Sequence, residues 1–245
     1  MTQNIYDDPE FFEGYAQMPR SIEGFAGASE WPAMRALLPD LRGLRVLDLG
    51  CGYGWFCRWA HEQGAASVRG LDVSRKMLEK AARDFPAEGI EYMRTDLETV
   101  NLPVVAFDLV YSSLALHYIE DLASLFERIH TALTPGGRLV FSIEHPIYMA
   151  PQNPRWSIDK NGHQSWPLDS YFLEGPRITH WLAPGVVKQH RTLGTTLNLL
   201  LRANLSITHV EEWRPSPQQI AARPEMIEEL DRPMFLLIAA QKASL

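Results

Sequence analysis

A short glycine-rich segment has the residue types of a ligand-binding loop. Residues 48–54 read DLGCGYG and follow the apolar run 45–50, which has the character of a buried strand. Glycine adopts positive φ angles at no steric cost and lets a ligand approach the backbone closely. We therefore expect Gly50, Gly52 and Gly54 to face a bound molecule.

Two aspartates follow later apolar runs and suit a nucleoside. Asp72 ends the second run, where its carboxylate can accept hydrogen bonds from both hydroxyls of a ribose. Asp96 ends the third run, where it can accept from an adenine amino group while the Leu97 backbone N–H donates to the ring. The alternatives are a helix N-terminal aspartate at position 72 and a strand-end turn residue at position 96.

A dinucleotide is a weaker interpretation of the same loop. Its G-x-G-x-x-G pattern places a pyrophosphate on the helix N-terminus, with a third glycine for close packing. Here the position of that third glycine is Trp55, and an indole would block either contact. A Rossmann-type oxidoreductase is thus the lesser alternative.

The elements that must position these residues alternate between strand and helix. We predict strands over 45–50, 67–74, 90–96, 106–116 and 138–145, with helices over 55–64, 75–85 and 120–133. A helix over 194–205 and strands over 207–213 and 233–241 complete the pattern. This order indicates an α/β, Rossmann-like, doubly wound sheet with helices on both faces, and such sheets bind ligands at the carboxyl ends of their strands.

Two segments fall outside the alternation. Residues 1–40 are aromatic and broken by Pro and Gly, which indicates short helices and turns that cap the site. Residues 146–192 are rich in Trp, Pro and His and contain a predicted hairpin, 171–182 with 186–193. Aromatic side chains suit a lid over a small planar or apolar substrate, and they suit a homodimer interface as well. Both interpretations stay open, and they are compatible.

Composition limits the classes of function. The 245 residues suit one α/β domain with an insertion, and the net charge of −7 argues against a nucleic-acid partner. No apolar run reaches the roughly 20 residues of a membrane span, and no secretory signal is evident, so we expect a cytoplasmic protein. Cys51 and Cys57 have neither a disulfide framework nor a metal-type spacing, and we expect no metal.

Five motifs together resemble a known family. VLDLGCGYG (46–54), LDVS (71–74), RTDLE (94–98), FDLVYSSLALHYIED (107–121) and LTPGGRLVFSIEHP (133–146) look like successive motifs of class I S-adenosylmethionine-dependent methyltransferases. The most similar group is methyltransferase type 11, akin to enzymes of ubiquinone and menaquinone biosynthesis. The resemblance covers about 100 of the 245 residues. It implies a single domain over 1–245 with seven strands, the antiparallel seventh, 233–241, lying between the fifth and sixth.

The resemblance also assigns site residues around S-adenosylmethionine, whose product is S-adenosylhomocysteine. Asp72 would hold the ribose, and Asp96 and Leu97 the adenine edge. Arg20 is a candidate for the methionine carboxylate, with a plain surface role as the alternative. The remaining residues would contact the cofactor or order the loop around it: Tyr15, Asp48, Gly50, Gly52, Gly54, Val73, Met77, Ser112 and Leu114.

The implied reaction is an in-line displacement in which a small-molecule acceptor attacks the methyl group, and we favour an oxygen acceptor over nitrogen or carbon. Alignment of the partners can contribute up to roughly 7–11 kcal/mol. His145 and then His117 are the candidate general bases, because both follow strands at the ligand edge. Strand-end histidines also commonly satisfy backbone groups. A non-catalytic, cofactor-binding regulatory protein is the alternative, since methyl transfer needs no invariant catalytic residue.

Overall fold

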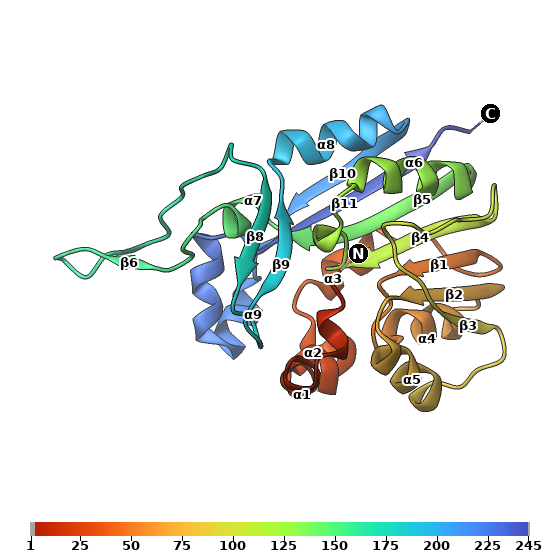
Figure 1. The fold of residues 1–245 in the computed structure, drawn as a ribbon, viewed down its shortest axis with the longest axis horizontal. Coiled ribbons are helices and arrows are strands. Elements are labelled where there is room, and N and C mark those ends of the chain that lie inside the picture. The colour runs from red at the N-terminus through yellow and green to blue at the C-terminus, as the bar shows by residue number, and fades with distance from the viewer. Residues whose placement is uncertain (1–2, 245) are drawn as a thin grey trace.

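The computed structural model describes residues 3–244, so residues 1, 2 and 245 of the expected domain, and the first two of the 1–40 segment, lie outside it. Its centre is a seven-stranded sheet in the order β10-β11-β5-β4-β1-β2-β3 (Figure 1). In chain order the strands are β1 (Arg45–Leu49), β2 (Ser67–Asp72), β3 (Ile90–Arg94), β4 (Phe107–Ser113), β5 (Leu133–Glu144), β10 (Leu205–Glu212) and β11 (Phe235–Lys242).

The pairing confirms the predicted sheet. β1 pairs in parallel with β2 and β4, β2 with β3, and β4 with β5, whereas β11 is antiparallel to both β5 and β10. The strand order reverses between β1 and β4, so the loop after β1 opens at the switch point where ligands bind in such sheets. β5 begins at Leu133, earlier than the predicted 138, because Leu133 pairs with Phe107 across an irregularity in register.

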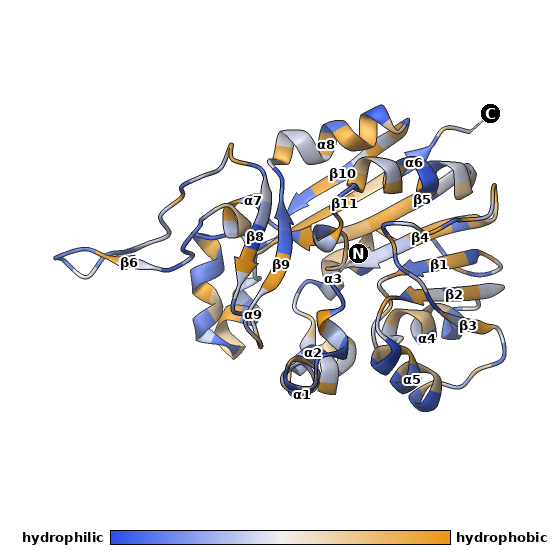
Figure 2. Ribbon diagram, in the orientation of Figure 1, coloured by the Kyte–Doolittle hydropathy of each residue, from blue (hydrophilic) through white to orange (hydrophobic). Residues whose placement is uncertain are grey.

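Helices cover both faces of the sheet. On one face α3 (Trp31–Ala36), α4 (Trp55–Glu62) and α5 (Arg75–Asp84) pack on Val46, Val68 and Leu237. On the other, α6 (Leu122–Ala132) and α8 (Leu193–Arg202) pack on Leu47 and Phe141. Neighbouring residues of a strand point to opposite faces, and both faces are covered, so the strands in the middle of the sheet are largely apolar, most clearly β5 and β11 (Figure 2).

The segments outside the alternation lie over the carboxyl ends of the strands. The amino-terminal segment contributes η1 (Ile5–Asp7), α1 (Pro9–Ala16), α2 (Pro19–Ile22) and η2 (Gly24–Gly27). The insertion contributes α7 (Pro146–Met149), a small hairpin of β6 (Ser157–Ile158) and β7 (Gln164–Ser165), and a second hairpin of β8 (Gly175–Thr179) and β9 (Val186–His190). Three further elements connect the larger ones: η3 (Leu116–Tyr118), α9 (Pro217–Ala222) and η4 (Pro224–Leu230).

The second hairpin forms where it was predicted, with shorter strands. Arg177 donates to the carbonyls of Ala150, Ser170 and Leu173, which holds the chain before β8 in an irregular path. Leu182 has a φ of +60°, which interrupts the strand before β9. Within residues 3–244, no helix has both the length and the apolar character needed to span a membrane.

Candidate cofactor and acceptor site

A cavity of about 310 Å³ opens at the carboxyl ends of β1, β2, β4 and β5. A second hollow, of about 110 Å³, adjoins it and shares Tyr15, Arg20, Gly50, Gly52 and Ser113. The lining of the larger cavity extends from the glycine loop to the residues that follow β4 and β5. One continuous space therefore connects the loop with the far end of the cavity.

The glycine loop bends over the end of β2. The Gly50 and Cys51 N–H groups both donate to the Leu71 carbonyl, at 2.8 and 3.0 Å. Gly52 has a φ of +51°, and a Cβ added there would meet nothing within 4 Å. The backbone at Gly52 thus borders open space, which fits a cofactor lying against the loop.

Gly54 has a different role from the one expected. It is the left-handed N-cap residue of α4, with a φ of +76°, and it does not line either cavity. A Cβ at this position would lie 2.4 Å from the Tyr92 hydroxyl oxygen. Glycine is needed here for the turn and for packing against β3.

Asp72 lies between the loop and α5 and is 8% exposed. Its Oδ2 accepts from the Gly52 N–H at 2.9 Å and its Oδ1 from the Ser74 N–H at 2.8 Å. Each carboxylate oxygen can accept a further hydrogen bond. The residue lines the large cavity, so its position fits the two hydroxyls of a ribose.

The pKa of Asp72 predicts pH-dependent cofactor binding. Burial raises this pKa from the ordinary 3.8 to about 6. The protonated carboxyl therefore stabilises the folded protein fully below pH 3.8, and this contribution to the unfolding free energy is lost as the pH rises through about 6. Ribose hydroxyls favour the ionised form, so cofactor affinity should change in the opposite direction. We expect the dissociation constant to fall by up to about tenfold per pH unit below pH 6 and to level off above pH 7.

Calorimetry in buffers of different ionisation enthalpy measures this effect as proton release near pH 6. Asp72→Asn should reduce the pH dependence to the part contributed by Asp48, whose pKa burial raises to about 7. A wild-type dissociation constant that does not change between pH 5 and 7 would contradict the prediction.

The adenine side of the cavity brings together the residues expected there. Val73, Met77, Asp96 and Leu97 all line the same cavity as Asp72. The Asp96 Oδ1 accepts from the Glu98 N–H at 3.0 Å, which fixes the turn after β3. Met77 is fully buried beneath, on α5.

Asp48 and Ser112 lie below the main cavity. Asp48 lines the smaller hollow, where its Oδ2 accepts from the Cys57 thiol at 3.3 Å. Ser112 is buried, and its hydroxyl donates to the Leu49 carbonyl at 2.7 Å. The next residues, Ser113 and Leu114, line the main cavity instead. Side chains alternate along β4, so the expected serine is displaced by one position.

Tyr15 and Arg20 reach both hollows from the amino-terminal segment. The Arg20 Nη2 donates to both carboxylate oxygens of Glu30, at 3.1 and 3.3 Å. Glu30 is only 2% exposed and was not identified from the sequence. Burial alone would lower the pKa of Arg20, but the Glu30 charge outweighs it and the pKa is raised. Arg20 therefore stays charged at the methionine end.

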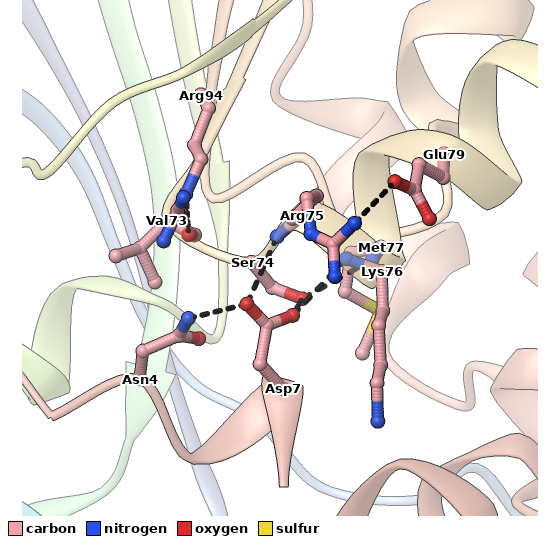
Figure 3. Close-up of polar contacts among 9 residues, drawn as sticks. All are labelled: Asn4, Asp7, Val73, Ser74, Arg75, Lys76, Met77, Glu79 and Arg94. Carbon is pink, nitrogen blue, oxygen red and sulfur yellow. Dashed lines mark hydrogen bonds and ion pairs between the residues drawn. The ribbon is translucent and has the colours of Figure 1, made fainter. Parts of the chain in front are cut away.

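Asp7 fastens the amino-terminal segment to α5 (Figure 3). Its Oδ1 accepts from the Ser74 hydroxyl at 2.6 Å and the Lys76 N–H at 3.0 Å. Its Oδ2 accepts from the Asn4 side chain at 2.7 Å and the Arg75 N–H at 3.3 Å. A carboxylate at a helix N-terminus is favoured by the free N–H groups and by the helix dipole. The neighbouring Tyr6, on η1, lines the cavity beside the ribose position.

Removing this contact should speed cofactor release. Asp7→Ala deletes every hydrogen bond between the carboxylate and α5, so we expect the dissociation rate of S-adenosylmethionine to rise about tenfold, as for a loss of about 1.4 kcal/mol. The core is not involved, so the unfolding free energy should fall by less than about 1 kcal/mol.

Stopped-flow displacement with excess S-adenosylhomocysteine measures the rate. Glu10→Ala is the matched control, because Glu10 is an exposed carboxylate on the same segment. Equal dissociation rates in Asp7→Ala and Glu10→Ala would show that the contact does not retain the cofactor.

The two candidate histidines differ in position. The His145 Nδ1 accepts from the Ile147 N–H at 3.0 Å, which caps α7, and its Nε2 lies 2.9 Å from Glu212. Both ring nitrogens are thus engaged, and His145 does not line the cavity. The physical reason is Pro146, which begins a helix at that point and turns the ring into a capping position. This placement does not favour His145 as a base.

His117 does line the cavity. Its Nδ1 accepts from the Glu144 N–H at 3.3 Å. Burial, assisted by Lys188 and Arg191, lowers the pKa of His117 well below its usual value. The ring is therefore neutral and carries its proton on Nε2, so it is set to donate a hydrogen bond rather than to accept a proton.

Several cavity residues were not identified from the sequence. Glu144, at the end of β5, and Tyr118, on η3, line the acceptor end together with residues from the insertion and from the start of β11. These further residues are Tyr148, Trp181, Met234 and Phe235. The available signals were the strand-end position of Glu144 and the predicted aromatic lid over 146–192, which contains Tyr148 and Trp181. Tyr118, Met234 and Phe235 are brought in by long-range packing.

The structure thus places most of the expected site residues around one cavity. Those that line it are Tyr15, Arg20, Gly50, Gly52, Asp72, Val73, Met77, Asp96, Leu97, Leu114 and His117. Those that do not are Asp48, Gly54, Ser112 and His145.

Comparison with known proteins agrees with this geometry. Residues 47–141 match the model of the methyltransferase domain family. The chain is 62% identical to an S-adenosylmethionine-dependent methyltransferase from Mesorhizobium loti, with a TM-score of 0.87 over 89% of this chain and 100% of that one. A Listeria monocytogenes structure for which the same activity is proposed is 38% identical, with a TM-score of 0.81 over 89% and 99% of the two chains.

A more distant relative carries a more specific name. A malonyl-acyl-carrier-protein O-methyltransferase of Enterobacter lignolyticus is 35% identical over 132 residues, which are 54% of this chain. The matched part spans about half, 51%, of that relative. The family match and the seven-stranded topology favour a methyltransferase over the alternative of a Rossmann-type oxidoreductase. The chain therefore belongs to the class I S-adenosylmethionine-dependent methyltransferases, enzymes that take their methyl group from S-adenosylmethionine and leave S-adenosylhomocysteine.

Proposed function

We propose that the protein transfers the methyl group of S-adenosylmethionine to an oxygen atom of a small molecule. The observation that carries this proposal is the single cavity that joins two different ends. One end has the glycine loop, Asp72 and Asp96, and the other has His117 and Glu144. A methyl donor bound at the first end would present its sulfonium toward the second.

At the cofactor end, Asp72 would accept from the ribose hydroxyls, and Asp96 and Leu97 would read the adenine edge. Arg20 would donate to the methionine carboxylate by charge-assisted hydrogen bonds. Residues 1–40 would act as a cap, because Tyr6 and Tyr15 line the cavity and Asp7 fastens the segment to α5. The cofactor supplies an activated methyl group, so the protein's work is alignment and the exclusion of water.

At the acceptor end, residues 146–192 would act as the lid. Tyr148 and Trp181 of this segment line the cavity, and the Trp181 ring packs edge-on against Phe11 of α1, at 5.4 Å between centroids. The lid and the cap therefore meet above the site. An aromatic enclosure of this kind suits a planar or apolar acceptor.

An oxygen acceptor is favoured by two observations. The neutral His117 can donate a hydrogen bond to an oxygen atom, whereas it offers nothing to a protonated amine. The Enterobacter relative is named as an O-methyltransferase. His117, rather than His145, is thus the histidine that would hold the acceptor, as a donor and not as a base. The sulfonium C–S bond breaks as the O–C bond forms, and the hydroxyl proton would pass to water.

Two measurements test the proposal in sequence. Calorimetry should show binding of S-adenosylmethionine at a single site. A screen of phenols, alcohols, carboxylic acids, amines and thiols, with methyl-labelled cofactor, should then give label in an oxygen-linked product. Tight cofactor binding without labelled product from any class would favour a non-catalytic protein, and label on nitrogen or carbon would refute the oxygen assignment.

A further inference from the structure

A buried ion pair joins the sheet to the insertion at the acceptor end. The Lys188 Nζ, on β9, donates to the Glu144 Oε1, at the end of β5. The two side chains are 4% and 15% exposed. Glu144 lines the cavity, whereas Lys188 does not. The carboxylate therefore faces the cavity, and the ammonium lies behind it.

Lys188 is held from a second side. Its Nζ lies 4.8 Å from the centroid of the Trp181 ring, whose negative face attracts a cation. A buried ion pair is tolerated only where additional contacts compensate for the lost hydration. Lys188 thus has the geometry of a positioning residue that fixes the Glu144 side chain and connects the lid to the sheet.

Glu144 keeps one carboxylate oxygen available. Within residues 3–244, its Oε2 makes no hydrogen bond, although an ionised carboxylate can accept several. The charge of Glu144 contributes, after burial, to raising the pKa values of both Tyr118 and Tyr148. Both phenols are therefore close to it and keep their protons. An acceptor in this part of the cavity would meet a carboxylate oxygen that has neutral phenols beside it and the Lys188 ammonium behind it.

The charges around the cavity disfavour an anionic acceptor. Of the side chains between residues 3 and 244 that line it, Arg20 is the one lysine or arginine, and it is already paired with Glu30 at the methionine end. The carboxylates that line it are Asp72, Asp96 and Glu144. Burying an unpaired carboxylate or phosphate beside Glu144 would bring like charges together at high cost.

We infer that Glu144 is a specificity-determining residue, which accepts a hydrogen bond from an O–H or N–H group of the methyl acceptor and excludes acceptors that carry a negative charge. This inference rests on the proposed small-molecule methyl transfer. If Glu144 has this role, the acceptor of this protein is not a free carboxylate. Glu144 contacts the acceptor directly, and Lys188 acts through Glu144.

Three probes of similar size test the charge preference: 2-phenylethanol, 2-phenylethylamine and phenylacetate. Each would be titrated into protein loaded with S-adenosylhomocysteine, with binding followed by protein-observed NMR up to millimolar concentrations. In the wild type we expect phenylacetate to bind at least tenfold more weakly than 2-phenylethanol. No variant is needed for this comparison.

Two variants then identify the group responsible. Glu144→Gln keeps the size of the side chain but leaves the Lys188 charge unbalanced, so phenylacetate should gain at least tenfold relative to 2-phenylethanol. The double variant with Glu144→Gln and Lys188→Met removes both charges, so phenylacetate should still gain relative to wild type, but less than in Glu144→Gln alone, where the Lys188 charge also attracts it. Lys188→Arg keeps the pair and should retain the wild-type preference.

The inference is wrong if wild-type protein binds phenylacetate as tightly as 2-phenylethanol, if none of the probes binds, or if Glu144→Gln leaves the ratio of the two affinities unchanged. These outcomes are independent of turnover, because the probes are measured on the product complex. Failure of the proposed function would appear instead as absent cofactor binding or absent labelled product.

Discussion

Replacing Asp72 with alanine is expected to weaken S-adenosylmethionine binding by two to four orders of magnitude. Each hydrogen bond to a charged group contributes roughly 1.5–3 kcal/mol, and the variant would lose the hydrogen bonds to two ribose hydroxyls. Every 1.4 kcal/mol corresponds to about a tenfold change in affinity. The same carboxylate also holds the Gly52 N–H at 2.9 Å, so the loop loses a support as well. Calorimetry at pH 7.5 measures the change directly.

The effect should be specific to binding. Because burial raises the pKa of Asp72 to about 6, its ionised form at neutral pH is less favourable in the folded protein than in water. Removing the carboxylate relieves this cost but leaves the Gly52 and Ser74 N–H groups without their partner, so the two effects should offset and the unfolding free energy should change by no more than about 1–2 kcal/mol, as judged by urea denaturation. Glu10→Ala is the control, because it removes an exposed carboxylate from the same chain. An Asp72→Ala dissociation constant within threefold of wild type would refute the ribose assignment.

The second large effect is expected at Gly50, where alanine should destabilise the fold by about 2–5 kcal/mol. Gly50 has a φ of +75°, in a region that costs an L-residue roughly 1–2 kcal/mol. A Cβ there would also lie 2.3 Å from the Ala115 Cβ, and overpacking of this kind typically costs about 1–3 kcal/mol. Ala115 lines the cavity, so its displacement should weaken cofactor binding too. Urea denaturation and calorimetry measure the two effects.

Gly52→Ala is the matched control for this prediction. Gly52 shares the positive φ, at +51°, but a Cβ there meets nothing within 4 Å. Its cost in unfolding free energy should be limited to the backbone strain, about 1–2 kcal/mol, while the methyl group enters the space assigned to the cofactor. Adding Ala115→Gly to Gly50→Ala should restore part of the lost stability. If Gly50→Ala is no more destabilising than Gly52→Ala, the contact with Ala115 does not matter.

Much of the fold, and the cofactor end of the site, could be predicted from local patterns in the sequence. Apolar runs such as 45–50, ending in glycine or aspartate, indicate buried parallel strands, and the ends of such strands share one edge of the sheet. The meeting of Gly52, Asp72 and Asp96 at one cavity was therefore predictable before any coordinates. The position of the antiparallel β11 came from the family resemblance and not from periodicity.

Side-chain direction was harder to predict than backbone direction. Ser113 lines the cavity and Ser112 does not, because neighbouring residues of a strand point to opposite sides. His145 is turned away because Pro146 starts a helix that the histidine caps. A one-residue error in a strand end, or an unrecognised four-residue helix, is enough to move a side chain out of a site.

The sequence by itself determined the order of the elements and the edge of the sheet at which the cofactor loop and its aspartates gather, because hydrophobic period and glycine placement act over a few residues. Only the tertiary structure decided the contacts that close the site: Asp7 on the N-terminus of α5, Arg20 with Glu30, and Lys188 with Glu144. Asp7 and Ser74, like Glu144 and Lys188, lie far apart in the chain, and what brings them together is the packing of the cap and the insertion over the sheet. No local propensity encodes such a pair, since its stability depends on the burial and charge that both segments acquire only after they have docked.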